Sequence, residues 1–148
     1  MKDIIKRILK EETEYKDLIV PYRLEDRPER YKRILYKKIQ EYIKNGSKGH
    51  LDLSNTPIDG LPSNLKTVGS ALYLEGTKIL ELPPNLTIGG SLNLNYTPIH
   101  RIPEGLRVGG DLWLINTPLG QKYSEDEIEY KIVELGGYVK RSIINKRK

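Results

Sequence analysis

Residues 91–114 read SLNLNYTPIHRIPEGLRVGGDLWL and contain one complete repeat together with the start of the next. The repeat begins with Leu-x-Leu, a motif that recurs at spacings of 21, 20 and 20 residues. Its four copies are Leu51–Leu53, Leu72–Leu74, Leu92–Leu94 and Leu112–Leu114. A fixed period of this length is typical of a solenoid, in which each short unit stacks on the next because it cannot bury its apolar face alone.

The positions that follow Leu-x-Leu recur in the same phase. All four copies continue with Thr and an apolar residue, and the first three go on with Leu-Pro or Ile-Pro, a further Leu, and Val-Gly or Ile-Gly. The extra residue of the first interval lies between Leu65 and Val68. The threonine column is Thr56, Thr77, Thr97 and Thr117, and the glycine column is Gly69, Gly89 and Gly109.

Each part of the repeat predicts a local structure. Leu-x-Leu alternates with period two, so it predicts a short strand whose leucines point inward. The threonine hydroxyl can bind nearby backbone groups, and the prolines favour an extended return leg. The glycine allows a tight bend at φ angles that other residues avoid. We therefore expect an α/β solenoid with a parallel sheet of about four to five short strands.

The two ends of the chain predict helical caps for the exposed ends of this stack. In the N-terminal cap, residues 1–49, apolar residues recur at helical spacing over residues 2–16. A second helix is expected from about Pro28 to Lys44, where Asn45-Gly46 is a typical stop signal. The solenoid itself occupies residues 50–119, and the whole chain is expected to form one compact domain.

The C-terminal cap, residues 120–148, is expected to hold a helix and a strand. Ser124 and Glu127 have the spacing of a capping box, and Gly136 ends the helix. Residues 137–141 align with residues 110–114, which places Val139 in the first leucine column and Arg141 in the second. This alignment predicts a degenerate fifth coil whose strand extends the sheet.

Charge and composition narrow the class of protein. The net charge is +5, and residues 50–119 hold four Lys/Arg and six Asp/Glu, so the basic character belongs to the two ends. The 148 residues include no Cys, which excludes disulfides and thiol ligands. No apolar run approaches the length of a bilayer span or a signal peptide. A cytoplasmic protein without membrane attachment is expected.

The repeat resembles the leucine-rich repeat, in the short variant that bacterial secreted effectors also contain. The resemblance covers roughly residues 50–119. The usual repeat reads Leu-x-x-Leu-x-Leu-x-x-Asn-x-Leu. This sequence departs from it at two columns, with Thr in place of Asn and Gly in place of the first Leu.

The whole chain also resembles small repeat proteins encoded by bacteriophages and other large DNA viruses. The matching stretches are Asn55-Thr56-Pro57-Ile58, Val108-Gly109-Gly110, Lys122-Tyr123-Ser124-Glu125 and Gly136-Gly137-Tyr138-Val139-Lys140. This resemblance implies a viral source, and hence the host cytoplasm as the location. The resemblance does not indicate what the protein does.

Residues that alternate with the inward leucines are expected on an exposed sheet face, which often forms the binding surface of repeat proteins. Trp113 and Tyr73 fall in one column of this face, and such aromatics are favoured interface anchors. In a second interpretation, Trp113 simply covers the sheet or packs on the C-terminal strand. The candidate partner-binding residues are Asp52, Tyr73, Glu75, Asn93, Asn95, Trp113, Ile115, Tyr138 and Lys140.

The second expected helix carries a cluster of cations with interleaved tyrosines. Such a helix could follow the phosphates of a nucleic acid. In the alternative interpretation, the cations only solvate an exposed helix face, and Glu29 and Glu41 dilute the charge. The candidate phosphate contacts are Arg30, Lys32, Arg33, Lys37 and Lys38.

Catalytic motifs are not found in the sequence. The two histidines, His50 and His100, fall in different repeat columns, and the Gly-Gly pairs lack the Lys and Ser/Thr of a phosphate loop. We therefore expect a protein-binding module that is no enzyme and needs no metal or cofactor. Given the viral resemblance, a specific version is a phage factor that binds and inhibits a host defence protein. The alternative is a nucleic-acid-binding accessory protein that uses the basic helices.

Overall fold

The computed structural model describes residues 27–144, so the helix expected over residues 2–16 lies outside the described part of the chain. The chain divides into two compact units, residues 1–34 and residues 35–148. The described part of the first unit is the start of helix α3 (Arg27–Lys44). The second unit contains the rest of α3 and all of the repeats, and it is the unit described below.

Helix α3 begins one residue before the expected Pro28 and ends at Lys44, as the sequence predicts. Gly46 follows with a φ of 97°, a left-handed conformation in which glycine avoids a steric penalty. Within the second unit, Leu35 and Ile39 of α3 are buried in the core. The ammonium group of Lys38 donates to the carbonyl oxygen of Asp52 at 3.0 Å. This part of α3 therefore packs against the first coil.

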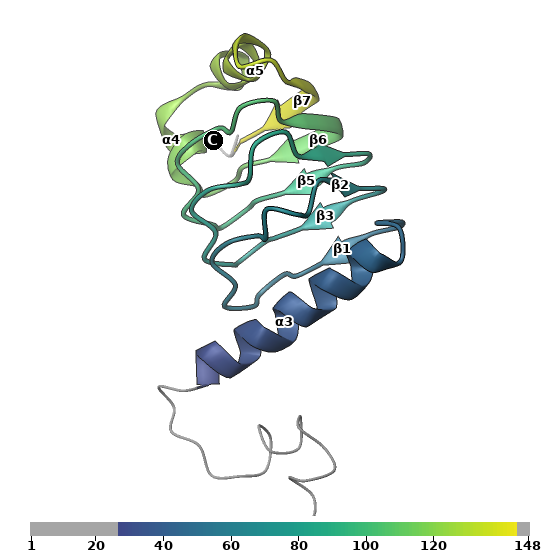
Figure 1. Ribbon diagram of the computed structural model, residues 1–148. Coiled ribbons are helices and arrows are strands. Elements are labelled where there is room, and N and C mark those ends of the chain that lie inside the picture. Colours follow the sequence, from purple (N-terminus) through teal and green to yellow (C-terminus); the bar gives the residue numbers. More distant parts are fainter. Residues whose placement is uncertain (1–26, 145–148) are drawn as a thin grey trace, which may run out of the picture. The chain divides into compact units, whose positions relative to one another are not determined.

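Seven strands of the described residues form one parallel sheet, drawn as short arrows in Figure 1. The order is β1-β3-β5-β6-β4-β2, and β7 pairs with β6. The strands are β1 (Leu51–Asp52), β2 (Thr67–Val68), β3 (Leu72–Tyr73), β4 (Thr87–Ile88), β5 (Leu92–Asn93), β6 (Arg107–Trp113) and β7 (Tyr138–Ile143). The fold is therefore α/β with a parallel sheet, and the stacked coils are compatible with a solenoid-like arrangement.

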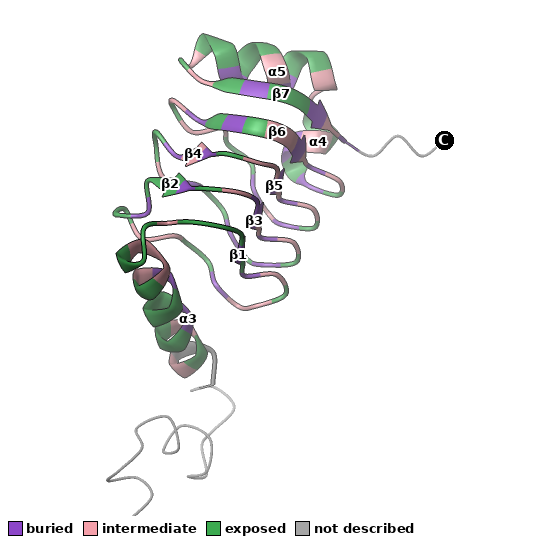
Figure 2. Ribbon diagram, turned by 90° about the vertical axis from the view of Figure 1, so that its right-hand side faces the viewer, coloured by how far each residue is buried: buried purple, intermediate pink, exposed green. Residues whose placement is uncertain are grey.

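The first ladder of the sheet consists of the Leu-x-Leu strands. Leu51, Leu72, Leu92 and Leu112 are paired in register from coil to coil. None of the eight leucines of the motif is more than 2% exposed, and the buried residues follow the inner side of the coils in Figure 2. Burial of a leucine side chain contributes about 1.5–3 kcal/mol. The leucines of the motif thus point inward, as predicted, and their burial contributes to the stability of the stack.

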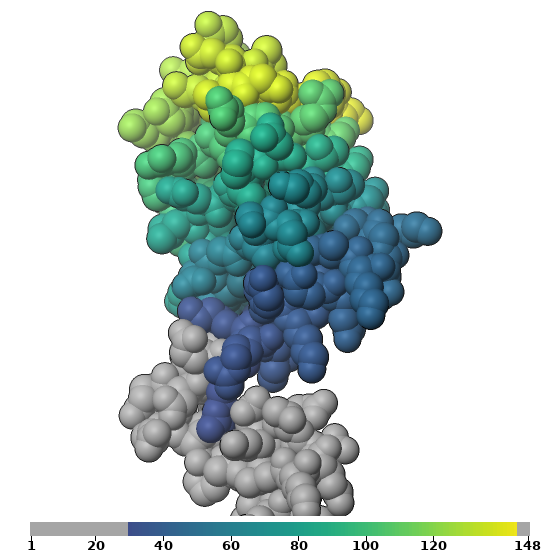
Figure 3. All heavy atoms as spheres, in the orientation of Figure 1, coloured from purple at the N-terminus to yellow at the C-terminus, as the bar shows by residue number. Residues whose placement is uncertain are grey.

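A second ladder makes the prediction of four to five strands too low. Strand β2 pairs with β4, with Thr67 beside Thr87 and Val68 beside Ile88, and β4 pairs in turn with the beginning of β6. Val68, Ile88 and Val108 are buried. Each coil therefore contributes one short strand to the first ladder and one to the second. Figure 3 shows side chains filling the space between the stacked coils.

The glycine column has a different role from the predicted one. Gly69, Gly89 and Gly109 are absent from the residues with positive φ, so they supply no left-handed bend. A Cβ atom on Gly89 would instead collide with the carbonyl oxygen of Gly69, and one on Gly109 with that of Gly89. Glycine is needed because consecutive backbones approach closely at this column.

The threonine hydroxyls bind the backbone as expected. Each donates to the carbonyl oxygen three residues earlier at 2.7–2.8 Å, which closes the turn after the strand within its own coil. Thr117 also accepts from the Gly120 amide and so caps α4 (Pro118–Lys122). The sequence analysis did not anticipate this short helix.

Helix α5 (Glu125–Glu134) and strand β7 follow the fourth coil. The capping box of Ser124 and Glu127 is present in both directions, and Gly136 follows the helix with a φ of 85°. Ile128 and Ile132 are fully buried. The helix thus packs on the coils through one face, and β7 extends the sheet beside β6 as predicted.

The predicted register of β7 is wrong. Val139 pairs with Val108, and Arg141 pairs with Asp111, so neither lies in a leucine column. Ser142 pairs with Leu112, and Ile144, which is 9% exposed, takes the next inward position. The shift arises at a β-bulge, where two residues of β6 after Val108 oppose one residue of β7.

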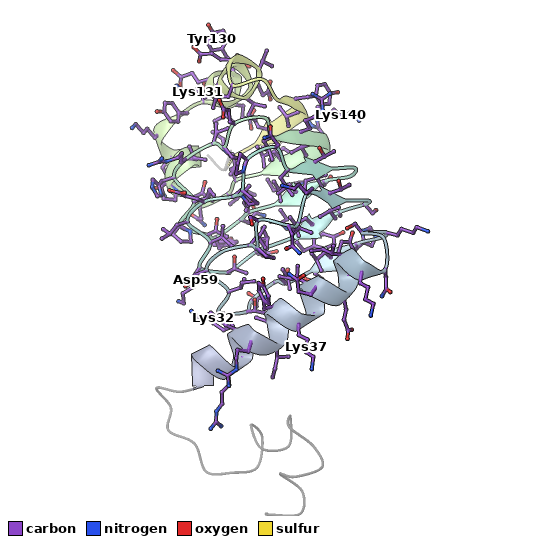
Figure 4. All side chains as sticks on the ribbon, in the orientation of Figure 1. Lys32, Lys37, Asp59, Tyr130, Lys131 and Lys140 are labelled. Atoms are coloured by element: carbon purple, nitrogen blue, oxygen red, sulfur yellow. The ribbon has the colours of Figure 1, made fainter. Side chains whose placement is uncertain are left out.

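Tyr138 and Lys140 are displaced by the same bulge. Tyr138 lies beside Arg107, next to the second ladder, and not in the column of Trp113. Lys140 lies opposite the bulge and projects from β7 (Figure 4). Both side chains are exposed. The residue that continues the column of Trp113 is Ile143.

Candidate functional site

The candidate site is the exposed side of the first ladder, which we call the sheet face. Its central column consists of Asp52, Tyr73, Asn93, Trp113 and Ile143, which are paired in register across five coils. Each of these residues alternates with buried side chains of the core, so it projects from the opposite side of the strand. The inward column is Leu in the first four coils and Ser142 in the fifth, whereas the central column changes at every coil.

The first two coils bring an imidazole, a phenol and a carboxylate together. The rings of His50 and Tyr73 are 5.7 Å apart and tilted by 56°. The Nδ1 atom of His50 accepts a hydrogen bond from the Ala71 amide at 3.1 Å, which fixes the ring over the second coil. The backbone amide of Ser54, followed by its hydroxyl, lowers the pKa of Asp52. This carboxylate is exposed and ionised at neutral pH.

The next two coils are linked by side-chain amides. Asn93 donates from Nδ2 to the carboxylate of Glu75 at 3.2 Å and accepts from the Asn95 amide at 2.9 Å. The Oδ1 atom of Asn95 accepts from the Ile115 amide at 2.7 Å. These bonds hold the polar side chains in fixed positions.

The last two coils present the apolar part of the sheet face. Trp113, Ile115 and Ile143 are half-buried, so each retains surface that a partner could cover. Beside them, Arg141 donates from Nε and Nη2 to the two carboxylate oxygens of Asp111, both at 3.2 Å. The guanidinium lowers the pKa of Asp111. An aromatic and aliphatic patch thus lies beside a bidentate ion pair.

The sheet face brings together seven of the nine predicted partner-binding residues and leaves out Tyr138 and Lys140. His50 and Ile143 join it. Among the described residues, no group of three or more His, Cys, Asp or Glu side chains could hold a metal ion. His50 lies on the sheet face, and His100 lines a groove beside α5. The groups that this surface offers are aromatic rings, side-chain amides and charged side chains.

Tyr96 is an exposed aromatic residue at a turn beside this surface that sequence reasoning missed. Its amide donates to the carbonyl oxygen of Ile115, and its side chain is 55% exposed at the turn after the third strand. Its φ is 59°, in the left-handed region. The other coils place Asn55, Gly76 and Asn116 at this position, also with positive φ. The signal was an aromatic residue in a column of Asn and Gly.

The predicted phosphate contacts do not share one environment. Lys37 projects from α3 away from the coils (Figure 4), and Arg33 is exposed on the same helix. Lys38 is bound to the backbone of Asp52. Arg30 and Lys32 are half-buried and engaged in interactions of their own. Of the five cations, Arg33 and Lys37 are the ones most open to a phosphate.

A groove beside α5 is a second surface that the sequence analysis did not identify. It has a volume of about 540 Å³, and a neighbouring hollow of about 320 Å³ continues along the helix. The groove is lined by His100, Arg101, Ile102, Leu119, Tyr123, Lys131, Glu134 and Leu135.

Among the described residues, no helix is long and apolar enough to cross a membrane.

Comparison of this chain with known families, sequences and structures identified no relative. No protein-family model, no curated protein sequence and no solved structure matches this chain.

Proposed function

We propose that this chain is a non-enzymatic protein–protein interaction module of the leucine-rich-repeat type, with α3 at one end and α5 and β7 at the other acting as caps. The observation that carries the proposal is the central column of the sheet face. Five different side chains stand there in register above inward positions that are nearly uniform. Side chains that differ from coil to coil above a constant core are typical of a surface whose residues are selected for contact with a partner.

The sheet face has the chemistry of a protein interface. Its apolar end, with Trp113, Ile115 and Ile143, offers an anchor of the kind that dominates binding energy. Tyr73 adds an aromatic ring with a polar tip, and the asparagines add donors and acceptors already fixed by neighbouring bonds. The partner that fits is a protein surface with an apolar centre and polar groups facing the amides.

In its specific version, the proposal is a viral factor that works in the host cytoplasm by binding and inhibiting a defence protein. This version rests on the resemblance to phage-encoded repeat proteins. Its test is recovery of a host protein on the immobilised chain, followed by an activity assay of that purified protein with and without the chain. A bound host protein whose activity does not change would contradict the inhibitory version and leave the binding role intact.

The role of the sheet face is tested by Trp113→Ala with the partner recovered in this way. Removal of a central aromatic anchor costs about 2 kcal/mol or more, so we expect the Kd to rise at least about 30-fold. Calorimetry with the purified partner measures this change. The matched control is Leu80→Ala, which shortens an apolar side chain that is 49% exposed outside the sheet face. Equal Kd values for wild type, variant and control would refute the assignment of the face.

Trp113 also provides a direct signal because it is the only tryptophan of the chain. We expect its fluorescence emission to shift to shorter wavelength as the partner is titrated, because a half-buried indole then leaves water. The shift should saturate with the Kd found by calorimetry. An unchanged spectrum at saturation would place the partner elsewhere on the molecule.

A second candidate function is nucleic-acid binding through α3, favoured by the exposure of Arg33 and Lys37. Affinity for a short duplex or single strand should then fall steeply with salt, because bound cations release counterions from the phosphates. Lys37→Glu should weaken it, whereas Lys78→Glu, at an exposed lysine of the second coil, should not. Absence of binding at low salt would exclude this function.

A further inference from the structure

The outer side of α5 is unlike the surface that usually ends a stack of coils. Terminal repeats normally present a polar outer face, which keeps the stack from growing. On α5, Ile128 and Ile132 face the coils and are fully buried. On the opposite side, Tyr130 is 69% exposed and Val133 is 63% exposed, and Tyr130 projects away from the coils in Figure 4. Two large apolar side chains thus stand on the outer side of the helix that ends the stack of coils in the second unit.

Acidic side chains surround these two residues. Helix α5 holds five Asp/Glu and one Lys, a net charge of −4. Glu125 and Glu129 are used internally, because they accept from the backbone amides of Ile144 and Ser142. The other three line or flank the hollow of about 320 Å³ beside Tyr130, which consists of Tyr123, Asp126, Glu127, Tyr130, Lys131 and Glu134.

A partner for this surface must combine cations with apolar side chains. Asp126, Glu127 and Glu134 favour basic groups, while Tyr130 and Val133 gain from apolar contact. The chain carries a surface of this chemistry at its other end. The part of helix α3 in the second unit, residues 35–44, holds three Lys and one Glu, a net charge of +2, and exposes Tyr36, Lys37 and Lys44.

These two surfaces belong to opposite ends of the second unit. The part of α3 from Leu35 onward packs beside β1, and α5 packs beside β7 (Figures 1 and 2). One copy can therefore offer its α3 to the α5 of the next copy without using the sheet face. Pairing of two α5 helices would bring two net charges of −4 together, and pairing of two of these α3 segments would oppose two of +2. Charge therefore favours the head-to-tail arrangement.

We propose that the outer face of α5 is a self-association surface, and that it binds the exposed face of α3 from a second copy of this chain. Such a contact is heterologous and leaves one free surface at each end, so it produces open chains of copies. The contact consists of about one helix face on each side. It therefore belongs to the small and weak class of interfaces.

The test starts with the full chain in sedimentation equilibrium over a series of protein concentrations. The average mass should rise steadily with concentration at about 0.1 M salt and fall at about 1 M salt, between which the Debye length shrinks from about 10 to about 3 Å. A chain that stays monomeric across the series at low salt would overturn the proposal.

Two blocked variants distinguish head-to-tail contact from its alternatives. The double variant Tyr130→Glu/Val133→Glu blocks α5, and Lys37→Glu/Lys44→Glu blocks α3. Each should be monomeric alone, because every contact needs one surface of each kind. Mixed in equal amounts, they should form a dimer that grows no further, since each supplies the surface that the other lacks.

Each other outcome contradicts the proposal. An α3-blocked variant that still dimerises would indicate α5–α5 contact, and an α5-blocked variant that still associates would assign the contact to another surface. A mixture that stays monomeric would refute the pairing. Leu80→Glu and Lys78→Glu are matched controls at exposed positions of the second coil and should associate like wild type. If the glutamate variant of α5 loses helix content, Tyr130→Ser/Val133→Ser replaces it with the same expected results.

Discussion

The backbone of Tyr96 adopts a conformation that the other coils assign to Asn or Gly. All four residues of this column have φ between 56° and 74°. Asn and Gly tolerate that region, whereas a bulky side chain there crowds its own backbone. Backbone positions of this strained kind often occur at functional sites, so Tyr96 is a candidate for substitution.

The first prediction concerns this position. Tyr96→Asn should raise the free energy of unfolding by about 1 kcal/mol, because Asn adopts the left-handed region more readily. Urea denaturation measures the change. The reciprocal substitution Asn116→Tyr, in the same column of the next coil, should lower stability by a similar amount. If both changes leave the unfolding midpoint where it is, the left-handed geometry carries no strain. Weaker partner binding by Tyr96→Asn would then place Tyr96 in the interface.

The ion pair of Asp111 and Arg141 makes stability depend on pH. The guanidinium lowers the pKa of Asp111 in the folded protein. The stabilisation is therefore complete above the ordinary carboxyl pKa of about 4, and it is lost as the pH falls through the lowered value. Asp111→Asn should be less stable than wild type at pH 7, with a difference that narrows below pH 4. Denaturation curves at several pH values measure this difference. In the Arg141→Gln background, adding Asp111→Asn should change the free energy of unfolding only slightly. A further loss as large as the one that Asp111→Asn causes in the wild-type protein would contradict the coupling.

At the scale of the strand, sequence reasoning found one ladder and missed the other. Leu-x-Leu shows its alternation because buried leucines flank an exposed residue. Thr67–Val68 and Thr87–Ile88 are strands of two residues, too short to show a period. The glycine that follows each was interpreted as a bend, because close approach between coils cannot be detected in one chain segment. The pairing of whole coils was needed to distinguish the two roles.

The register of β7 was mispredicted for a related reason. The alignment of Gly137 with Gly110 matched residue types and allowed no bulge in the partner strand. The structure places Ser142 and Ile144 inward and leaves Arg141 exposed to pair with Asp111. Burying the Arg141 guanidinium without a partner would cost more free energy than accommodating one extra residue in β6. The sheet-face residues of the first four coils were predictable from alternation alone, whereas the fifth row depended on this bulge.

The close approach of coils gives a prediction for the second ladder. Gly89→Ala should lower the free energy of unfolding by about 1–3 kcal/mol, the usual cost of inserting a methyl group where backbone has no room. The neighbouring atom is the Gly69 carbonyl oxygen, which the ladder holds in place. Gly60→Ala is the matched control, because nothing lies within 4 Å of its added Cβ. A loss of stability in Gly60→Ala equal to that in Gly89→Ala would contradict this explanation.

At the scale of the whole molecule, the sheet face is separate from the two surfaces proposed for self-association. The sheet face follows the first ladder along the stack, whereas the association surfaces are the outer face of α5 and the exposed face of α3. No described residue assigned to one surface is assigned to the other. The free-energy changes caused by substitutions at distant sites are usually additive.

This separation predicts that partner binding and self-association are independent. Tyr130→Ser/Val133→Ser should abolish association and leave the Kd for the partner within about twofold of wild type, because additivity usually holds within about 0.3–0.5 kcal/mol. Trp113→Ala should weaken the partner and leave the sedimentation behaviour unchanged. A variant on one surface that alters both measurements would show that the surfaces are coupled.

The stacked glycines also limit how a chain of this kind can change its length. The one extra residue of the first repeat, at Lys66, lies on the return leg, where the chain restores its pairing by Thr67. An insertion between Val68 and Leu72 would instead shift a glycine out of the column where backbones touch. Whole repeats can be gained or lost without that penalty, because each new copy brings its own leucines, threonine and glycine. Duplication or deletion of a 20-residue unit is therefore the route by which such a gene could add or remove a row of the sheet face without rebuilding the rows on either side.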